Sequence, residues 1–154
     1  MILQTSQYHI AIISSRFNEK ATKKLASGAH KFLIENGLRP ENVELFWVPG
    51  AWEIPYIANL LVAQKKYDAF ICIGVIIQGD TDHHRLIADQ CVSQMSKISL
   101  DNSVPFGNCV LTCHSMKEAL QRAGGKVGHR GIEAAIAVLE VLNLRDIIVS
   151  RKKS

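Results

Sequence analysis

Residues 68–85, DAFICIGVIIQGDTDHHR, join an apolar run to a polar segment that carries two adjacent histidines. Residues 68–77 are the most apolar run of the chain, which favours a strand buried on both faces of a sheet. The polar residues from Gly79 to Arg85 then follow the end of a central strand. In an open parallel sheet, ligands bind outside the carboxyl ends of the strands. This stretch therefore predicts both the middle of a sheet and the place of a ligand site.

The same alternation of strand and helix patterns extends along the rest of the chain. Apolar runs typical of strands occupy residues 9–14, 42–48, 68–77 and 106–112. Apolar residues at helical spacing occupy residues 18–36, 51–64, 83–100, 115–123 and 131–143. Strands alternating with helices predict an α/β fold with three layers, α/β/α, around a four-stranded parallel sheet.

The composition fits one globular domain. The chain has 154 residues, of which 47% are apolar and 21% charged, and 18 Lys and Arg against 14 Asp and Glu give a net charge of +4. This excludes disorder and leaves no room for a separate cofactor lobe. We expect a single domain over 1–154, with an arm at 1–8 and a tail at 145–154. The small positive charge suits nucleic acid or a phosphorylated small molecule.

Cysteines and apolar runs indicate the compartment. The four cysteines include no C-x-x-C pair, and Cys72 lies in the apolar run as a buried thiol would. No apolar stretch approaches the roughly 20 residues of a membrane span. Polar residues interrupt the first ten positions, so we expect no secretory leader. These features predict a protein of the reducing cytoplasm that makes no membrane contact.

Two of the loops that follow predicted strands carry aromatic and acidic residues. Phe17 follows the first strand, where it could stack on a flat ring or close the edge of the core, and Asn18 could be an N-cap. Glu53 lies in the first turn after Pro49-Gly50, a position that the helix dipole favours for a carboxylate. The same carboxylate could accept hydrogen bonds from a polyol.

The segment 79–85 is the most chemically dense. Gly79 allows a ligand to approach the backbone, and free N–H groups at the start of the next helix suit a phosphate, with Thr81 or Asp82 as cap. A histidine in the first turn suits a general acid or base. A capped surface helix with two solvated histidines explains the same residues. His83 and His84 diverge on a helix, which disfavours a metal site.

Residues 122–131 form a basic, glycine-rich segment. It contains four glycines and four potential cations, and an arginine can hold a phosphate with two hydrogen bonds. The segment matches neither the Walker motif nor the dinucleotide-binding motif. A flexible basic connection between two helices remains the alternative.

Six segments together resemble one enzyme family, the lumazine synthases (6,7-dimethyl-8-ribityllumazine synthases). They are SRFN at 15–18, VPGAWEIP at 48–55, GVIIQGDTDH at 74–83, VLT at 110–112, RAG at 122–124 and the turn that ends at Gly131. The resemblance extends from Ile10 to about Leu144 and implies a flavodoxin-like fold. It implies a transferase of riboflavin biosynthesis that condenses 5-amino-6-(D-ribitylamino)uracil with 3,4-dihydroxy-2-butanone 4-phosphate, without metal or organic cofactor.

The resemblance also implies residue roles. The general acid and base is His83. Residues that bind the pyrimidine and its ribityl chain are Phe17, Ala51, Trp52, Glu53, Ile76, Ile77, Asn108 and Arg130. Residues that bind phosphate are Gly79, Asp80, Thr81 and Arg122, the last reaching over from a neighbouring subunit. Asn108 occupies the place of an aromatic residue that reaches a neighbour's pocket, and Arg130 that of a lysine.

Several positions depart from the family pattern. Gln78 replaces an arginine, Arg85 and Leu86 replace an Asp-Tyr pair, and Asp82 places a negative charge near the phosphate. His84 or Arg85 could offset that charge. We expect these changes to affect substrate affinity and not the type of reaction. Two alternatives therefore stand beside the enzyme: a shell that binds flavin or lumazine without catalysis, and an unrelated flavodoxin-like protein that binds a phosphorylated ligand.

The resemblance finally implies a homo-oligomer. Family members form pentamers, some of them closed into shells of sixty chains, and the segment before Tyr8 often adds a strand to the neighbour's sheet. The turn at 124–131 is short, as in shell-forming relatives. Riboflavin synthase is a candidate partner, whereas nucleic acid and membrane are not expected.

Overall fold

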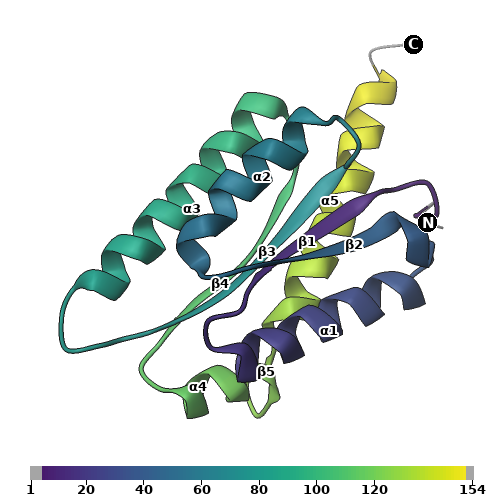
Figure 1. Cartoon of the computed structure of the whole chain (residues 1–154). Coiled ribbons are helices and arrows are strands. Elements are labelled where there is room, and N and C mark those ends of the chain that lie inside the picture. Colours follow the sequence, from purple (N-terminus) through teal and green to yellow (C-terminus); the bar gives the residue numbers. More distant parts are fainter. Residues whose placement is uncertain (1–4, 152–154) are drawn as a thin grey trace.

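The computed structural model describes residues 5–151 and has the predicted three-layer α/β/α architecture of the flavodoxin-like class (Figure 1). Its elements are β1 (Ile10–Ser15), α1 (Glu19–Glu35), the 3-10 turn η1 (Pro40–Asn42), β2 (Val43–Val48), the 3-10 turn η2 (Ala51–Glu53), α2 (Ile54–Ala63), β3 (Ala69–Ile77), α3 (His83–Asn102), β4 (Phe106–Cys113), α4 (Met116–Gln121), β5 (Ala123–Gly125), β6 (Gly128–His129) and α5 (Arg130–Arg151). Helices α2 and α3 cover one face of the sheet, and α1 and α5 cover the other (Figure 1).

The main sheet is parallel throughout, with the strand order β2-β1-β3-β4. Ile10 of β1 pairs with Ala69 of β3, and Phe70 of β3 pairs with Phe106 of β4. Strand β3 lies inside the sheet and is buried along its length up to Ile76. The prediction that residues 68–77 form a central strand is confirmed.

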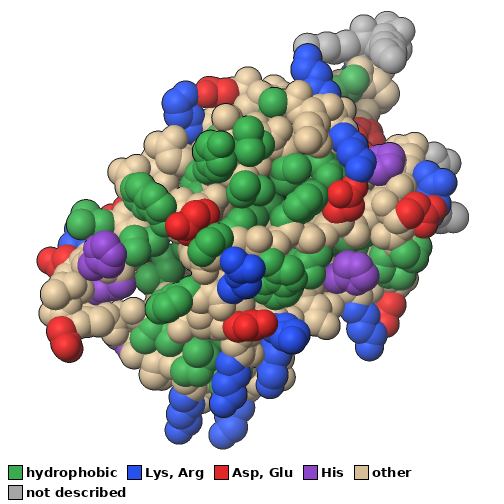
Figure 2. Space-filling view, viewed as in Figure 1, with side chains coloured by type: hydrophobic (Ala, Val, Ile, Leu, Met, Phe, Trp, Pro, Cys, Tyr) green, Lys and Arg blue, Asp and Glu red, His purple; other side chains and the backbone are tan. Residues whose placement is uncertain are grey.

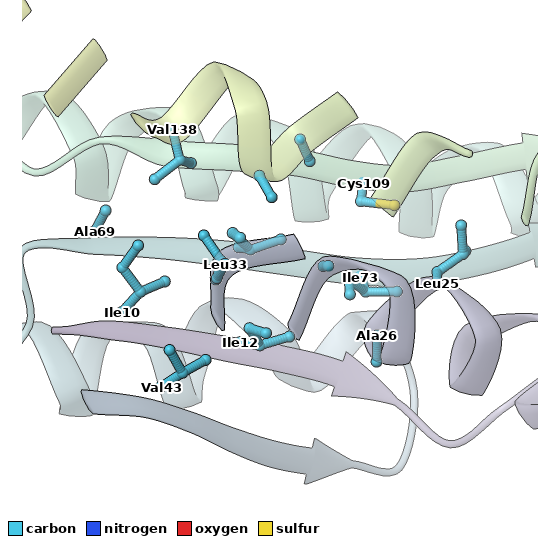
Figure 3. Packing of buried hydrophobic residues seen from close by; sticks show 14 of the residues in the cluster. Ile10, Ile12, Leu25, Ala26, Leu33, Val43, Ala69, Ile73, Cys109 and Val138 are labelled. Atoms are coloured by element: carbon cyan, nitrogen blue, oxygen red, sulfur yellow. The ribbon is translucent and has the colours of Figure 1, made fainter. Parts of the chain in front are cut away.

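The core lies on both faces of the sheet, because side chains alternate along each strand. Ile10, Ile12 and Ile73 face α1 and α5, where they meet Leu25, Leu33 and Val138 (Figure 3). On the other face Ile13, Phe70 and Cys72 pack beneath α2 and α3. The strands thus form a rigid support for the loops at their ends.

All four cysteines are free and buried. Cys72 lies on β3, Cys91 on α3, and Cys109 and Cys113 on β4. Burial raises the pKa of Cys91 and of Cys109 to about 12, so both are neutral thiols at physiological pH. Cys72 is the buried thiol that its apolar surroundings in the sequence predict.

Helices α1 and α5 cross closely at two glycines. A Cβ on Gly131 would lie 2.2 Å from the carbonyl oxygen of Leu25, and a Cβ on Gly28 would lie 2.2 Å from His129. The His129 ring fills this crossing: its Nε2 is 3.2 Å from the Lys24 carbonyl oxygen, and its Nδ1 accepts from the Ile132 amide at 3.2 Å. Part of the glycine-rich segment therefore serves helix packing.

The segment before this crossing is more ordered than the sequence predicts. Helix α4 ends at Gln121, short of the predicted 123, and residues 123–129 form the antiparallel hairpin β5–β6. Ser115 is the N-cap of α4, and its Oγ accepts from the Glu118 amide at 3.1 Å. The Glu118 carboxylate accepts in turn from the His114 amide at 2.8 Å.

The last helix is longer than expected. Residues 131–143 were predicted, and a tail was expected from 145, but α5 continues to Arg151. Residues 145–151 of the expected tail are helical, and two of them are held by distant residues: Arg145 lies 3.7 Å from Asp68, and Tyr8 donates a short hydrogen bond to Asp146. Residues 1–4 and 152–154, the ends of the predicted arm and tail, lie outside the described residues.

These contacts form a cluster, called here the amino-end clamp, of Tyr8, Asp68, Arg145 and Asp146 beside the amino ends of β1 and β3. Asp68 also accepts from the His9 amide at 2.8 Å, and Arg145 Nη2 lies 3.0 Å from Asp146. Burial, followed by the hydrogen bond to Asp146, raises the pKa of Tyr8 to about 12.

No helix within residues 5–151 is both long and apolar enough to span a membrane.

Candidate active site

A pocket of about 500 Å³ opens at the carboxyl ends of the strands, where the parallel-sheet rule places a ligand site. It is lined by Phe17, Pro49, Gly50, Ala51, Trp52, Glu53, Val75, Ile76, Ile77, Gly79, Thr81, His83, His84 and Ile87. Figure 2 shows histidine side chains beside hydrophobic ones at the end of the molecule where β3 leads into α3. The pocket thus combines apolar walls with a polar end.

Phe17 forms part of the wall because the loop after β1 is held from two sides. The Phe17 amide donates to the Pro49 carbonyl at 3.0 Å, and the Asn18 side chain donates to the Val75 carbonyl at 2.6 Å. Asn18 takes a left-handed conformation, with φ of 61°, and its side chain reaches β3 instead of capping α1. The Phe17 ring is 70% exposed, so it does not close the core and is free to stack on a ligand.

The loop after β2 supplies the opposite wall. Residues 51–53 form a 3-10 turn, and Pro55 follows in the first turn of α2, where the missing N–H is tolerated. The Glu53 carboxylate accepts from the Gly50 amide at 3.0 Å, so it stabilises this turn while it lines the pocket. Trp52 is 62% exposed beside it. Glu53 is the N-cap residue of α2 and not a residue of its first turn, and its binding of a polyol stays a prediction.

The turn between β3 and α3 provides the polar end. The hydroxyl of Thr81 accepts from the His83 amide at 3.4 Å, and Asp82 is the N-cap residue without a side-chain cap. Within residues 5–151, no acceptor takes the amide N–H groups of Gly79, Asp80 and Thr81. A Cβ on Gly79 would meet nothing within 4 Å, so the space around this turn is open. Unpaired amides beside a helix start are suited to an anion.

The sequence as a whole matches one family. The model of the 6,7-dimethyl-8-ribityllumazine synthases covers residues 7–146. The chain belongs to the 6,7-dimethyl-8-ribityllumazine synthase family. It is 40% identical over 150 residues to the 6,7-dimethyl-8-ribityllumazine synthase of Leuconostoc mesenteroides subsp. mesenteroides, a match that covers 97% of this chain and 96% of that relative. The family consists of transferases of riboflavin biosynthesis.

Most of the residues that the lumazine synthase resemblance implies come together in the pocket. The eight that line it are Phe17, Ala51, Trp52, Glu53, Ile76, Ile77, Gly79 and Thr81, in addition to His83. Asp80 lies in the same turn but does not line the pocket. These residues come from three separate segments, which the sheet brings to one edge.

Three expected residues lie elsewhere in this lumazine synthase chain. Asn108 is exposed on the edge strand β4 and accepts from the Val110 amide at 3.0 Å. Arg122 Nη1 donates to the Glu118 carbonyl at 3.2 Å and lies 3.3 Å from the Glu118 carboxylate. Arg130 pairs with Glu133 at 2.6 Å. A single chain therefore does not bring these side chains to the pocket.

Five residues that line the pocket were not among the expected site residues: Pro49, Gly50 and Val75, which adjoin expected ones in sequence, and two on α3, His84 and Ile87. Both follow His83 in the first turn and a half of α3, and residues three and four apart share a face of a helix. That spacing was the available signal, because Ile87 is four residues after His83. Within the described part of the chain, no three His, Cys, Asp or Glu side chains are grouped as metal ligands.

Proposed function

We propose that this pocket is the active site for the family's reaction, the condensation of 5-amino-6-(D-ribitylamino)uracil with 3,4-dihydroxy-2-butanone 4-phosphate. The products are 6,7-dimethyl-8-ribityllumazine, phosphate and water. The observation that carries the proposal is that one pocket unites an exposed aromatic ring, a carboxylate, a turn with unpaired amides and a histidine. Each of these groups meets one need of the reaction.

The apolar walls suit the pyrimidine and its ribityl chain. In this proposal Phe17 stacks on the flat pyrimidine ring, since an offset stack on an exposed aromatic face is favourable. Ala51, Trp52 and Glu53 contact the ribityl chain, and the Glu53 carboxylate accepts hydrogen bonds from its hydroxyls. Ile76 and Ile77, at the end of β3, contact the ring through backbone groups.

The polar end suits the phosphate. The amides of Gly79, Asp80 and Thr81 would donate to phosphate oxygens, because no acceptor within residues 5–151 takes them. Asp82 follows at the N-cap and opposes an anion, which predicts moderate affinity for the phosphorylated substrate. Arg122 from a neighbouring chain would supply a positive charge.

His83 is the proposed general acid and base. Its side chain is exposed at the pocket and makes no hydrogen bond within residues 5–151, so both ring nitrogens remain available to substrate. It would move protons during Schiff-base formation, phosphate elimination and ring closure. Holding two substrates in one pocket would supply much of the remaining acceleration, through orientation and saved entropy.

A homo-oligomer built from pentamers would complete this site. Asn108, Arg122 and Arg130 lie away from the chain's own pocket, as residues donated to a neighbour would. Large apolar side chains are also exposed on η2, α2 and α3, namely Trp52, Tyr56, Leu60, Leu86 and Leu100. We favour a closed shell, for which ultracentrifugation should show a species far heavier than a pentamer.

The proposed compartment is the cytoplasm, since all four cysteines are free and buried. Riboflavin synthase remains a candidate partner through the shared product.

A two-substrate assay tests the proposal. Purified protein, both substrates and a matched reaction without protein are followed by lumazine fluorescence and phosphate release. The proposal expects both signals to rise together and faster than in the uncatalysed reaction. A rate equal to the uncatalysed one would refute it, and tight flavin binding in calorimetry would then favour the non-catalytic shell that Gln78, Asp82 and Asn108 suggest.

A further inference from the structure

His84 makes a contact in the pocket that the assigned roles do not use. Its Nδ1 lies 2.9 Å from the carbonyl oxygen of Thr81, and its ring lines the pocket beside His83. A carbonyl oxygen only accepts hydrogen bonds, so Nδ1 carries the hydrogen in this contact. In the neutral ring, Nε2 then has the lone pair. The ring is half-buried, whereas the side chains of His83 and Arg85 on either side are exposed.

The contact restrains a turn that few other groups hold. The hydroxyl of Thr81 bonds the His83 amide only at 3.4 Å, Asp82 makes no side-chain cap, and Gly79 has open space around it. The peptide group that joins Thr81 to Asp82 is planar and trans, so its C=O and N–H point in opposite directions. Fixing the Thr81 carbonyl therefore fixes the direction of the Asp82 amide as well.

We propose that His84 is a positioning residue for the phosphate of the second substrate. Its Nδ1–H holds the Thr81 carbonyl and thereby orients, before phosphate arrives, the Asp82 amide, which follows Gly79, Asp80 and Thr81 in the turn proposed to bind phosphate. Donors that are oriented in advance bind an anion with less loss of conformational freedom than mobile donors do. This inference rests on the phosphate-binding role proposed above for that turn.

The proposal predicts different effects on the binding of the two substrates. The ring and ribityl chain of the pyrimidine are assigned to Phe17 and to residues 51–53, which do not contact the Thr81 carbonyl. Loss of the His84 contact should therefore weaken the binding of the phosphorylated substrate and of inorganic phosphate. The binding of the pyrimidine should not change. If His84 only stabilised the start of α3, its loss would weaken the binding of both substrates to a similar extent.

Two substitutions at one position test this directly. His84→Phe keeps a planar ring and removes the donor, whereas His84→Asn places an amide N–H close to the position of Nδ1 and keeps it. His30→Phe, on α1 and outside the pocket, is the matched control. Each protein is measured for KM of both substrates, for inhibition by inorganic phosphate and for its thermal midpoint.

We expect His84→Phe to raise KM for the phosphorylated substrate and the inhibition constant of phosphate by about three- to tenfold, the effect of one hydrogen bond. KM for the pyrimidine should stay within about twofold, His84→Asn should recover most of the phosphate binding that His84→Phe loses, and His30→Phe should match the wild type. The inference is overturned if His84→Asn is as impaired as His84→Phe, if both KM values rise together, or if His84→Phe changes neither constant.

Calorimetric titration with inorganic phosphate keeps this test apart from the proposed function. A wild type without turnover would refute the proposed function, while weaker phosphate binding by His84→Phe than by His84→Asn would still support the role of His84. Equal phosphate binding by the two variants, or none by the wild type, would overturn it.

Discussion

The two ends of the central sheet satisfy their polar groups in opposite ways. At the amino ends of β1 and β3, the clamp of Tyr8, Asp68, Arg145 and Asp146 pairs its side chains with one another. At the carboxyl ends, amides of the turn after β3 have no acceptor within residues 5–151, and Phe17 and Trp52 are largely exposed. Within residues 5–151, one end pairs its polar side chains with one another, and the other leaves backbone amides and aromatic rings open to solvent.

Because of this difference, we expect residues at the amino ends of the strands to determine stability and residues at the carboxyl ends to determine activity. Groups at the amino end contribute to the free energy of unfolding, because folding brings their partners together. Groups at the carboxyl end contribute little to it, because they contact few other residues, and so they remain available to substrate or to a neighbouring chain. Substitutions at the two ends should therefore affect different measurements.

The largest expected effect is at the carboxyl end, on turnover. His83→Ala should lower kcat by about 100-fold or more, the usual contribution of a general acid or base. The free energy of unfolding should change by less than about 0.5 kcal/mol, because the side chain is exposed. Steady-state kinetics and urea denaturation measure the two quantities. A raised KM with unchanged kcat would remove His83 from its role, and His30→Ala serves as control.

An intermediate effect is expected for Arg122, on one substrate only. Arg122→Ala should raise KM for the phosphorylated substrate by about tenfold, the scale of one charge-assisted hydrogen bond, with a smaller change in kcat. Arg122→Lys should lie between that variant and the wild type, because it keeps the charge and loses the paired donors. Equal effects of both substitutions on both substrates would point to a structural role through Glu118.

The smallest effect is expected at the amino end, on stability alone. Tyr8→Phe removes the hydrogen bond to Asp146 and should lower the free energy of unfolding by about 1 kcal/mol, with kcat unchanged. Chemical denaturation and the two-substrate assay on the same preparation check this. A loss of kcat comparable to the loss of stability would mean that the two ends are coupled.

Alkaline pH sharpens the same comparison. The pKa values of Tyr8 and of Tyr67 are raised from 10.0 to about 12, mainly by burial. Between pH 10 and 12 these tyrosines lose protons in the unfolded chain and keep them in the folded chain, so their contribution to stability is full below pH 10 and is lost as the pH rises to 12. Tyr8→Phe removes one of these two tyrosines, and its stability should fall less steeply, since Tyr67 and the buried cysteines, whose pKa values are also raised, contribute equally to both proteins. An identical fall in stability in both proteins would contradict a raised pKa of Tyr8 in the amino-end clamp.

The sequence predicts the sheet and most of the pocket because these depend on local patterns. The apolar run at 68–77 and the alternation of elements suffice for the parallel sheet, and the sheet rule then places Phe17, Glu53 and His83 at one edge. Patterns of this kind can be recognised within short segments of the sequence, without knowledge of contacts between distant residues.

The remaining features depend on contacts between distant residues. Helix α5 extends to Arg151 with contacts from Arg145 and Asp146 to Asp68 and Tyr8, more than 70 positions away. The hairpin β5–β6 forms from glycines that favour no single local structure. The role proposed for Arg122, opposite a phosphate bound in a neighbouring chain, would depend on contacts between chains, which the periodicity of one chain does not describe.

The four buried cysteines give this protein an internal probe of its own motions. A thiol reagent reacts with a thiolate, and burial in the sheet and under α3 keeps these groups both neutral and out of reach. Cys72 and Cys109 can be labelled only when the sheet opens, so their labelling rate reports the frequency of rare openings of the whole molecule. Cys113, at the carboxyl end of β4, should be labelled after smaller openings of that end of the sheet, so the labelling rates of these cysteines would report the motions of both regions.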